Sequence, residues 1–115
     1  MQYLLLIYDE ENKWAELPQD QVQALMGEYN RFTAELKASG HMVGANRLQS
    51  VENATTVRVR DGKTQVTDGP FAETREQLGG YYLIEAKDLD EATRIAARIP
   101  SARLGSIEVR PIFSH

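Results

Sequence analysis

Two continuous apolar runs constrain the fold of this chain more than any other feature. Residues 3–8 and 81–86 are apolar at almost every position, so each run gives a strand apolar side chains on both faces. Only two amphipathic helical stripes occur elsewhere, and two helices cover a single face of such a sheet. The other face would be a large exposed apolar patch, which monomers rarely tolerate. The sequence therefore predicts a homodimer joined sheet to sheet.

The two helical stripes have recognisable ends. The stripe over residues 22–36 repeats at spacings of three and four and is followed by Gly40, which suits a left-handed cap. The stripe over residues 89–99 follows Asp88, which lies three residues before Glu91 in the spacing of a capping box, and Pro100 ends it. Both stripes therefore predict helices with one buried side.

Shorter strands complete the pattern. We expect strands over residues 42–49, 55–60 and 64–67, with Asp61-Gly62 as the hairpin turn between the last two. An acidic, polar loop is expected over residues 9–12, a single helical turn over residues 73–78, and a final strand around Ile107 and Val109. This order predicts one α+β domain over residues 1–115, a ferredoxin-like split βαβ with an added β-hairpin. Paired sheet to sheet, two copies would form a dimeric α/β barrel.

Composition excludes several classes of protein. The 115 residues include 42% hydrophobic residues, carry a net charge of -4 and contain no cysteine. An acidic chain does not hold nucleic acid on a broad basic face, and no apolar run is long enough to span a bilayer. Disulfides and thiolate chemistry are absent. No metal-ligand spacing and no sign of an organic cofactor are present, and a cytoplasmic location is expected.

The stretch VTDGPFAETREQLGGYY, residues 66–82, gathers turn chemistry, one aromatic ring and charged groups. Asp68 is a turn residue that either bonds to its own loop or holds a carboxylate at the mouth of a cavity, where it could transfer protons. Phe71 either fills the core or forms the wall of a ligand pocket. We interpret the stretch as a structured flap that closes one end of a cavity.

Arginines and tyrosines supply the remaining candidates. Arg58 and Arg47 either join a structural network of ion pairs or bind the carboxylate of a small anionic ligand by a bidentate fork. For Arg58 and Arg110, the network would use Glu73 and Glu76 as partners. Tyr8 and Tyr29 either donate hydrogen bonds inside a pocket or bury their rings and pair their hydroxyls.

The chain resembles the YCII-related domain proteins, in the branch with an Asp-Gly-Pro-Phe signature. The resemblance lies in TTVRVRDGKTQVTDGPFAETREQLGGYYLIEAKDLDEA, GSIEVRPI, MQYLLLIYDEE and ELKASG. It implies the ferredoxin-like dimeric barrel. Some relatives resemble lyases or isomerases of small ring-derived acids, and genes of this branch often adjoin extracytoplasmic-function sigma factors. The positions at which shorter relatives carry a histidine and an aspartate hold Tyr29 and Ala38 here, so that acid/base pair is absent.

Two functions follow as hypotheses. In the first, a dimeric domain binds a small carboxylate or enol and acts as a lyase or isomerase. Asp68 would then transfer the proton, Arg58 or Arg47 would hold the anion, and Tyr8, Tyr29 and Phe71 would line the pocket. In the second, the domain is a regulatory module without chemistry whose partner is a sigma factor. A cavity of a few hundred cubic ångströms with convergent polar groups favours the first hypothesis, and a solid core favours the second.

Overall fold

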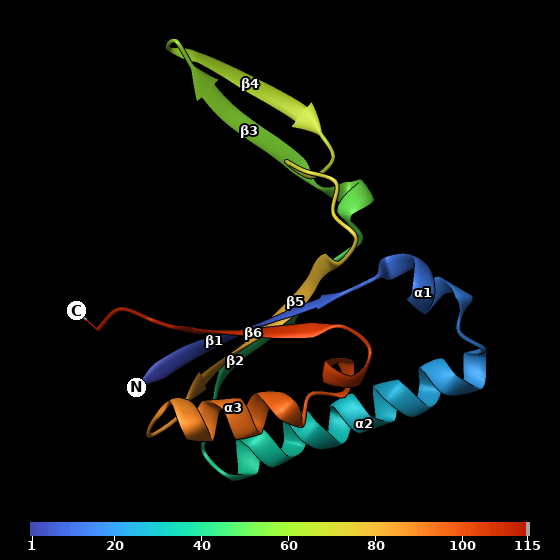
Figure 1. The fold of residues 1–115 in the computed structure, drawn as a ribbon, viewed down its shortest axis with the longest axis vertical. Coiled ribbons are helices and arrows are strands. Elements are labelled where there is room, and N and C mark those ends of the chain that lie inside the picture. Colours follow the sequence, from blue (N-terminus) through green and yellow to red (C-terminus); the bar gives the residue numbers. More distant parts are fainter. Residues whose placement is uncertain (115) are drawn as a thin grey trace.

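The computed structural model describes residues 1–114, which form a sheet covered by helices and a separate hairpin (Figure 1). The strands of the sheet are β1 (Gln2–Asp9), β2 (Met42–Arg47), β5 (Gln77–Glu85) and β6 (Ser106–Pro111). The hairpin consists of β3 (Thr55–Arg60) and β4 (Lys63–Asp68). The helices are α1 (Glu11–Glu16), α2 (Gln19–Ala38) and α3 (Leu89–Ala97), with short 3-10 turns at η1 (Val51–Asn53) and η2 (Pro100–Arg103).

The sheet has the strand order of a split βαβ fold. Its four strands run β2-β5-β1-β6, and every neighbouring pair is antiparallel. β5 lies between β1 and β2, which are joined by α2, and β1 lies between β5 and β6, which are joined by α3. The α+β fold predicted from the order of elements is therefore confirmed.

Alternation along β1 separates the two faces of the sheet. Tyr3, Leu5 and Ile7 point to the helices and are 2%, 0% and 7% exposed. Leu4 and Leu6 alternate with them on the opposite face and are only half-buried. The apolar run therefore serves two faces, as predicted, and in a single copy the second face has no cover. We call this second surface the open face.

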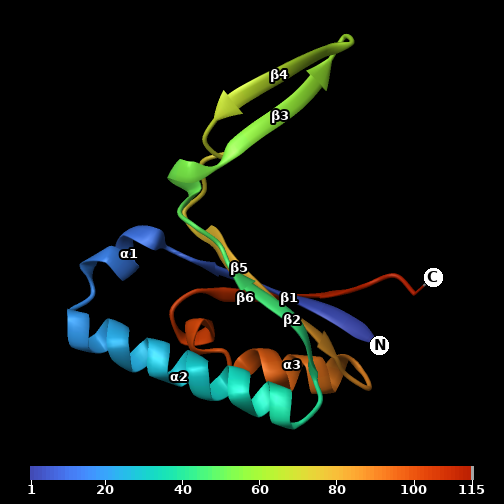
Figure 2. The ribbon, with the colours of Figure 1, turned by 180° about the vertical axis from the view of Figure 1, so that it is seen from behind.

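Both long helices lie on the same side of the sheet (Figures 1 and 2). Phe32 and Leu36, in the second half of α2, join the buried core, and the Phe32 ring meets the Tyr82 ring edge-on at 5.1 Å between centroids. The predicted N-cap is confirmed, because Asp88 Oδ1 accepts a hydrogen bond from the backbone N–H of Glu91 at 2.9 Å; the Glu91 side chain accepts from the backbone N–H of Lys87 at 3.0 Å. No helix within residues 1–114 is long and apolar enough to cross a membrane.

Two local predictions are wrong. The helical turn expected over residues 73–78 is absent, because Gln77 and Leu78 already belong to β5 and pair with Asp9 and Tyr8 of β1. Cross-strand pairing therefore overrides the local helical tendency. In the opposite sense, the acidic segment after β1, expected as a loop, forms the six-residue helix α1. A helix this short cannot display a periodic apolar stripe, so the sequence pattern does not reveal it.

The β3–β4 hairpin stands away from the sheet, and we call it the arm (Figures 1 and 2). Its turn is as predicted: Asp61 and Gly62 have φ values of 52° and 74°, the left-handed pair that a two-residue hairpin turn needs. The radius of gyration is 16.2 Å, whereas a compact chain of this length has one of about 13 Å. The arm therefore gives the single chain an unusually extended shape.

Gly105 provides a test of the packing between η2 and β1. An added Cβ at Gly105 would lie 2.1 Å from the backbone oxygen of Tyr8 and 2.9 Å from Cα and Cβ of Asp9. We expect Gly105→Ala to lower the free energy of unfolding by roughly 1–3 kcal/mol, as other overpacked sites do. The matched control is Gly44→Ala on β2, where an added Cβ meets nothing within 4 Å. Urea denaturation of both variants measures the difference, and equal stabilities would contradict the packing described.

Candidate functional site

A cavity of 590 Å³ lies on the helix-covered side of the sheet, where α1 and the first half of α2 meet the strands. Its walls come from β1, β2, β5, α1, α2 and η2. The residues of α2 that face it, Met26 and Tyr29, are only half-buried, in contrast to Phe32 and Leu36 further along the helix. The cavity therefore occupies the space that this half of α2 leaves unfilled.

Asp9 brings a carboxylate into the cavity wall. It is the last residue of β1 and continues the alternation of Tyr3, Leu5 and Ile7, so its side chain points to the helix side and is 8% exposed. Its Oδ2 accepts a hydrogen bond from Trp14 Nε1 of α1 at 2.9 Å. A buried carboxylate needs such a donor, and the bond also fixes its orientation. Asp9 is thus an ordered carboxylate in contact with the cavity.

Two phenols lie in the same wall. Tyr29 donates a hydrogen bond to Ser101 Oγ at 2.5 Å, and the hydroxyls of Tyr82 and Thr33 are 2.7 Å apart. Burial raises the pKa of Tyr29 above its ordinary value; the Ser101 hydrogen bond opposes this, and the negative charge of Asp9 adds to it. Burial likewise raises the pKa of Tyr82. Both phenols therefore keep their protons at neutral pH and can act as donors.

The cavity wall is mostly acidic and neutral. Arg47, at the end of β2, is the one cationic side chain among the described residues of the wall. Glu11 also lies there, and its oxygens accept hydrogen bonds from Ser50 Oγ and the backbone N–H of Val51, both at 3.0 Å. Since Glu11 is occupied by this segment, Asp9 and Arg47 are the charged groups best placed to meet a ligand.

The structure brings together some of the residues that the sequence singled out and separates others. Tyr29 and Arg47 both line the cavity. Tyr8 lies on the open face, since it alternates with Ile7 and Asp9 along β1. Asp68 is the last residue of β4 and is exposed, and Arg58 is on β3 of the arm. In the single chain these residues therefore form two groups rather than one site.

Phe71 and its neighbours connect the arm to the sheet. The ring of Phe71 is 76% exposed, so the interpretation of Phe71 as a core residue is wrong for the single chain. Its backbone oxygen accepts a hydrogen bond from Arg58 Nη2 at 3.3 Å. Further along, Arg75 forms an ion pair with Glu10 at 3.1 Å, which ties the end of the stretch to the start of α1.

The expected partners of the strand arginines differ from those observed. Arg110 pairs with Glu108, two residues away on the same strand, and the ion pairs within residues 1–114 do not include Glu73 or Glu76. The predicted network from these two glutamates to Arg58 and Arg110 is therefore not formed within residues 1–114 of the single chain.

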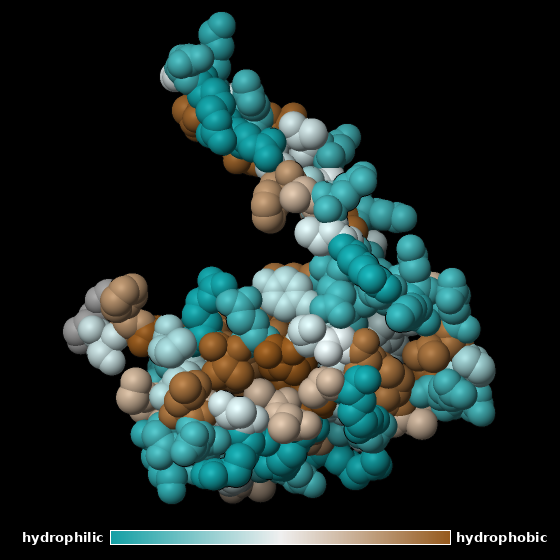
Figure 3. Space-filling view, in the orientation of Figure 1, coloured by the Kyte–Doolittle hydropathy of each residue, from teal (hydrophilic) through white to brown (hydrophobic). Residues whose placement is uncertain are grey.

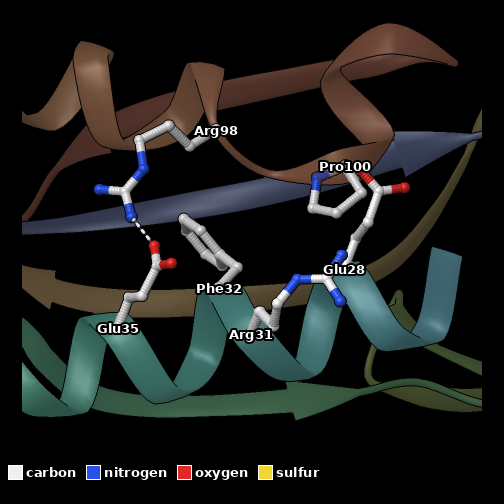
Figure 4. Close-up of a pocket in the computed structure, with 6 residues that line it drawn as sticks. All are labelled: Glu28, Arg31, Phe32, Glu35, Arg98 and Pro100. Atoms are coloured by element: carbon white, nitrogen blue, oxygen red, sulfur yellow. Dashed lines mark hydrogen bonds and ion pairs between the residues drawn. The ribbon is translucent and has the colours of Figure 1, made fainter. Parts of the chain in front are cut away.

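A second, smaller cavity of 140 Å³ lies between α2 and the end of α3 (Figure 4). Three of its four charged side chains are paired, Glu35 with Arg98 and Glu28 with Arg103, whereas Arg31 has no ion pair within residues 1–114. The Arg98 guanidinium also covers the Phe32 ring at 5.5 Å from its centroid. Ligand pockets usually have volumes of about 300–1,000 Å³, so the larger cavity is the candidate site.

Sequence reasoning missed Asp9 and Trp14. Asp9 was grouped with the acidic loop after the strand, although its position in the alternation with Leu5 and Ile7 was a signal that its side chain faces the core. Trp14 belongs to the helix that left no periodic signal. Within residues 1–114, the structure contains no cluster of three His, Asp or Glu side chains that could hold a metal ion.

The raised pKa values of Tyr29 and Tyr82 predict a pH dependence. In the unfolded chain both phenols ionise near pH 10, whereas in the folded chain they resist ionisation. Their contribution to stability is therefore complete below pH 10 and is lost as the pH rises through the folded pKa values. Urea denaturation between pH 8 and about 11 measures this loss. The free energy of unfolding should fall less steeply with pH in the variant with Tyr29→Phe and Tyr82→Phe than in Tyr8→Phe. Equal slopes would contradict the assignment.

Comparison with known proteins places the chain in a family. The YCII-related domain profile matches residues 1–115. An uncharacterized protein of Rhizobium meliloti (strain 1021) is 36% identical over 114 residues, which are 97% of this chain and 92% of that protein. Among solved structures, 5-chloro-2-hydroxyhydroquinone dehydrochlorinase (TftG) from Burkholderia phenoliruptrix AC1100, in complex with 2,5-dihydroxybenzoquinone, has a TM-score of 0.55 at 13% identity, covering 100% of this chain and 96% of that one. The structural similarity shows the fold, and the profile match over the whole chain shows that this chain belongs to the YCII-related domain family.

Proposed function

We propose that this domain binds a small, oxygen-rich ring compound or enol in the 590 Å³ cavity and transfers a proton on it, as lyases and isomerases do. One observation carries the proposal: the ordered carboxylate of Asp9 and the neutral phenol of Tyr29 lie in the wall of a cavity of ligand size. Cavities with a few convergent polar groups and perturbed pKa values are the usual place for such sites.

The cavity favours ligand binding over the alternative of a module without chemistry. A regulatory module that only contacts a sigma factor needs no internal space, and filling that space would stabilise the fold. Here the wall instead includes polar groups from Asp9, Tyr29, Arg47 and Ser101. A cavity lined by polar groups is better suited to binding a polar ligand than to packing a hydrophobic core.

The dehydrochlorinase structure, which has a similar fold, supports the proposed class of ligand. That dehydrochlorinase is in complex with 2,5-dihydroxybenzoquinone, a planar ring with several oxygens. At 13% identity the argument is an analogy between folds, not between residues. The cavity of this chain suits the same class of molecule, because Trp14 offers an aromatic surface, and Tyr29 and Arg47 offer donors to ligand oxygens.

A balanced step follows from these residues. Asp9 accepts a proton from a carbon next to a ligand carbonyl, and the electron pair of the broken C–H bond moves onto the carbonyl oxygen as an enolate. Arg47 stabilises that oxygen by a charge-assisted hydrogen bond, and the phenol of Tyr29 adds a second one by turning its O–H from Ser101 Oγ to the ligand. In an isomerisation Asp9 returns the proton to another carbon. In an elimination the enolate electron pair forms a C=C bond as a leaving group departs with its bonding pair from the neighbouring carbon, and Asp9 gives its proton to that leaving group. The Trp14 N–H holds the carboxylate throughout.

Asp68 is the competing proton-transfer residue. It was the carboxylate selected from the signature stretch, with Arg58, Tyr8 and Phe71 as ligand contacts, and in the single chain none of the four lines the cavity. Asp68 can serve the site only if another copy brings it there. Comparing matched substitutions of Asp9 and Asp68 separates the two assignments.

The single tryptophan, Trp14, reports binding directly because it lines the cavity. We expect 2,5-dihydroxybenzoquinone or small aromatic acids to change its fluorescence and to raise the melting temperature. Asp9→Asn, Tyr29→Phe and Arg47→Gln should each weaken binding roughly tenfold or more, the effect of losing a hydrogen bond to a charged group. With a turned-over ligand, Asp9→Asn should lower kcat by about 10²–10⁴-fold.

The controls for this experiment are Asp68→Asn and Tyr8→Phe, which make the same chemical changes outside the cavity. Both should bind like the unmodified protein. If these variants lose binding while Asp9→Asn and Tyr29→Phe keep it, the site lies at the signature stretch. If a broad set of ring acids, enols and quinones neither shifts the melting temperature nor changes the fluorescence, the proposed function is wrong.

We also propose that two copies pair through the open face. The apolar centre of this face is formed by Leu4, Leu6, Tyr81 and Leu83, which the helices do not cover. Light scattering at micromolar concentration should give twice the mass of the 13.0 kDa chain. Leu6→Lys should shift the protein to monomers, because it places a charge in the centre of the apolar face. Thr93→Lys, exposed on α3, should remain dimeric.

A further inference from the structure

We propose that the arm is an exchange arm: the apolar face of the β3–β4 hairpin of one copy packs against the second copy of this chain. The inference rests on the proposed sheet-to-sheet dimer and adds a second contact to it. The arm then holds the partner from the side, and each copy contributes one arm.

The arm needs a covering surface because its own copy supplies none. A two-stranded hairpin is marginally stable in water unless it packs on something. β3 and β4 contact each other extensively and have no comparable contact with any helix or other strand. Local hydrogen bonds hold only the base, from the backbone N–H of Gly69 to the oxygen of Ala54 at 2.7 Å and from Thr56 Oγ1 to the oxygen of Gly69 at 2.8 Å.

The two faces of the arm differ in character. Val57 lies opposite Val66, and Val59 lies opposite Thr64 on the same face. Val57 and Val59 are each 60% exposed, and Val66 is 66% exposed. The alternate positions form a polar face, on which Arg60 lies opposite Lys63. Strands with one apolar and one polar face are typical of sheets that bury one side, so the valine face indicates a missing contact.

The position of the arm points to a second copy. The arm rises on the side of the sheet opposite the helices and leans over the open face (Figures 1 and 2). The space-filling view shows open space between the arm and the body, with hydrophobic surface exposed on the arm (Figure 3). A second sheet packed on the open face, about 10 Å away, would enter this space. Two-fold symmetry then places each arm beside the other copy.

The distribution of charge along the chain also favours a second copy as the partner of the arm. The polar face of the arm carries Arg60 and Lys63, and neither has a carboxylate partner within residues 1–114. Residues 55–68 carry three basic and two acidic side chains, a net charge of +1, so with -4 for the whole chain the remaining residues carry -5. A basic arm against an acidic body favours association between copies rather than repulsion.

The test uses paired lysine substitutions on the two faces of the arm. Val57→Lys with Val66→Lys charges the valine face, and Gln65→Lys with Thr67→Lys charges the polar face of the same hairpin. Sedimentation equilibrium measures the dimer dissociation constant of each protein, and circular dichroism checks that the body stays folded. We expect the valine-face variant to dissociate at least tenfold more readily than the unmodified protein, and the control to be within about twofold of it.

Hydrogen exchange gives an independent readout on the unmodified protein. Backbone N–H groups of residues 57–66 that join the two strands should be protected in the dimer and should lose protection as dilution produces monomers. The outcomes are distinguishable. If the protein is dimeric but both variants dissociate alike and the arm exchanges rapidly at all concentrations, the exchange arm is wrong and the sheet dimer stands. If the protein is monomeric throughout, both proposals fail. Protection of the arm that does not depend on concentration would also overturn the exchange arm.

Discussion

The structure depends on the position of β1 between β5 and β6. Because both neighbours are hydrogen-bonded to it, β1 cannot shift by one residue without turning its whole buried face to the opposite side. The helix-facing positions therefore form one fixed row that begins in the core at Tyr3 and Leu5 and ends at Asp9. The same alternation that builds the hydrophobic core thus delivers a carboxylate to the cavity at the end of the strand.

Space for a ligand arises where the packing of α2 changes along its length. Phe32 and Leu36 pack closely against the sheet, whereas Tyr29, one turn earlier, bonds to Ser101 and leaves room beneath the helix. Gly80 lets β2 and β5 approach closely beside this space, since an added Cβ there would lie 2.8 Å from the backbone oxygen of Asn46. The cavity wall is therefore formed by packed strands and helices together with the segment that follows β2.

The sequence predicted long-range features better than local ones. The two apolar runs and the two helical stripes were enough to predict the split βαβ order. Burial of one face makes apolar side chains recur at a fixed spacing along strands and helices. Residues 73–78 were predicted wrongly because the pairing of Leu78 with Tyr8 is not a local property of the stretch. Tyr29 and Arg47, which the sequence singled out, line the cavity together with Asp9 and Trp14, which it did not single out because their contact depends on the short helix α1.

The insertion point of the arm has a thermodynamic consequence. The arm is inserted between β2 and β5, which pair with each other at Arg47 and Gly80 and continue through the hydrogen bond from Leu48 N–H to the oxygen of Gly79 at 2.9 Å. These four residues also form part of the cavity wall. Whatever orders the base of the arm therefore orders that wall, so assembly and ligand binding draw on the same conformational entropy. If the pairing and the ligand binding proposed above both occur, linkage requires that each strengthen the other by an equal factor.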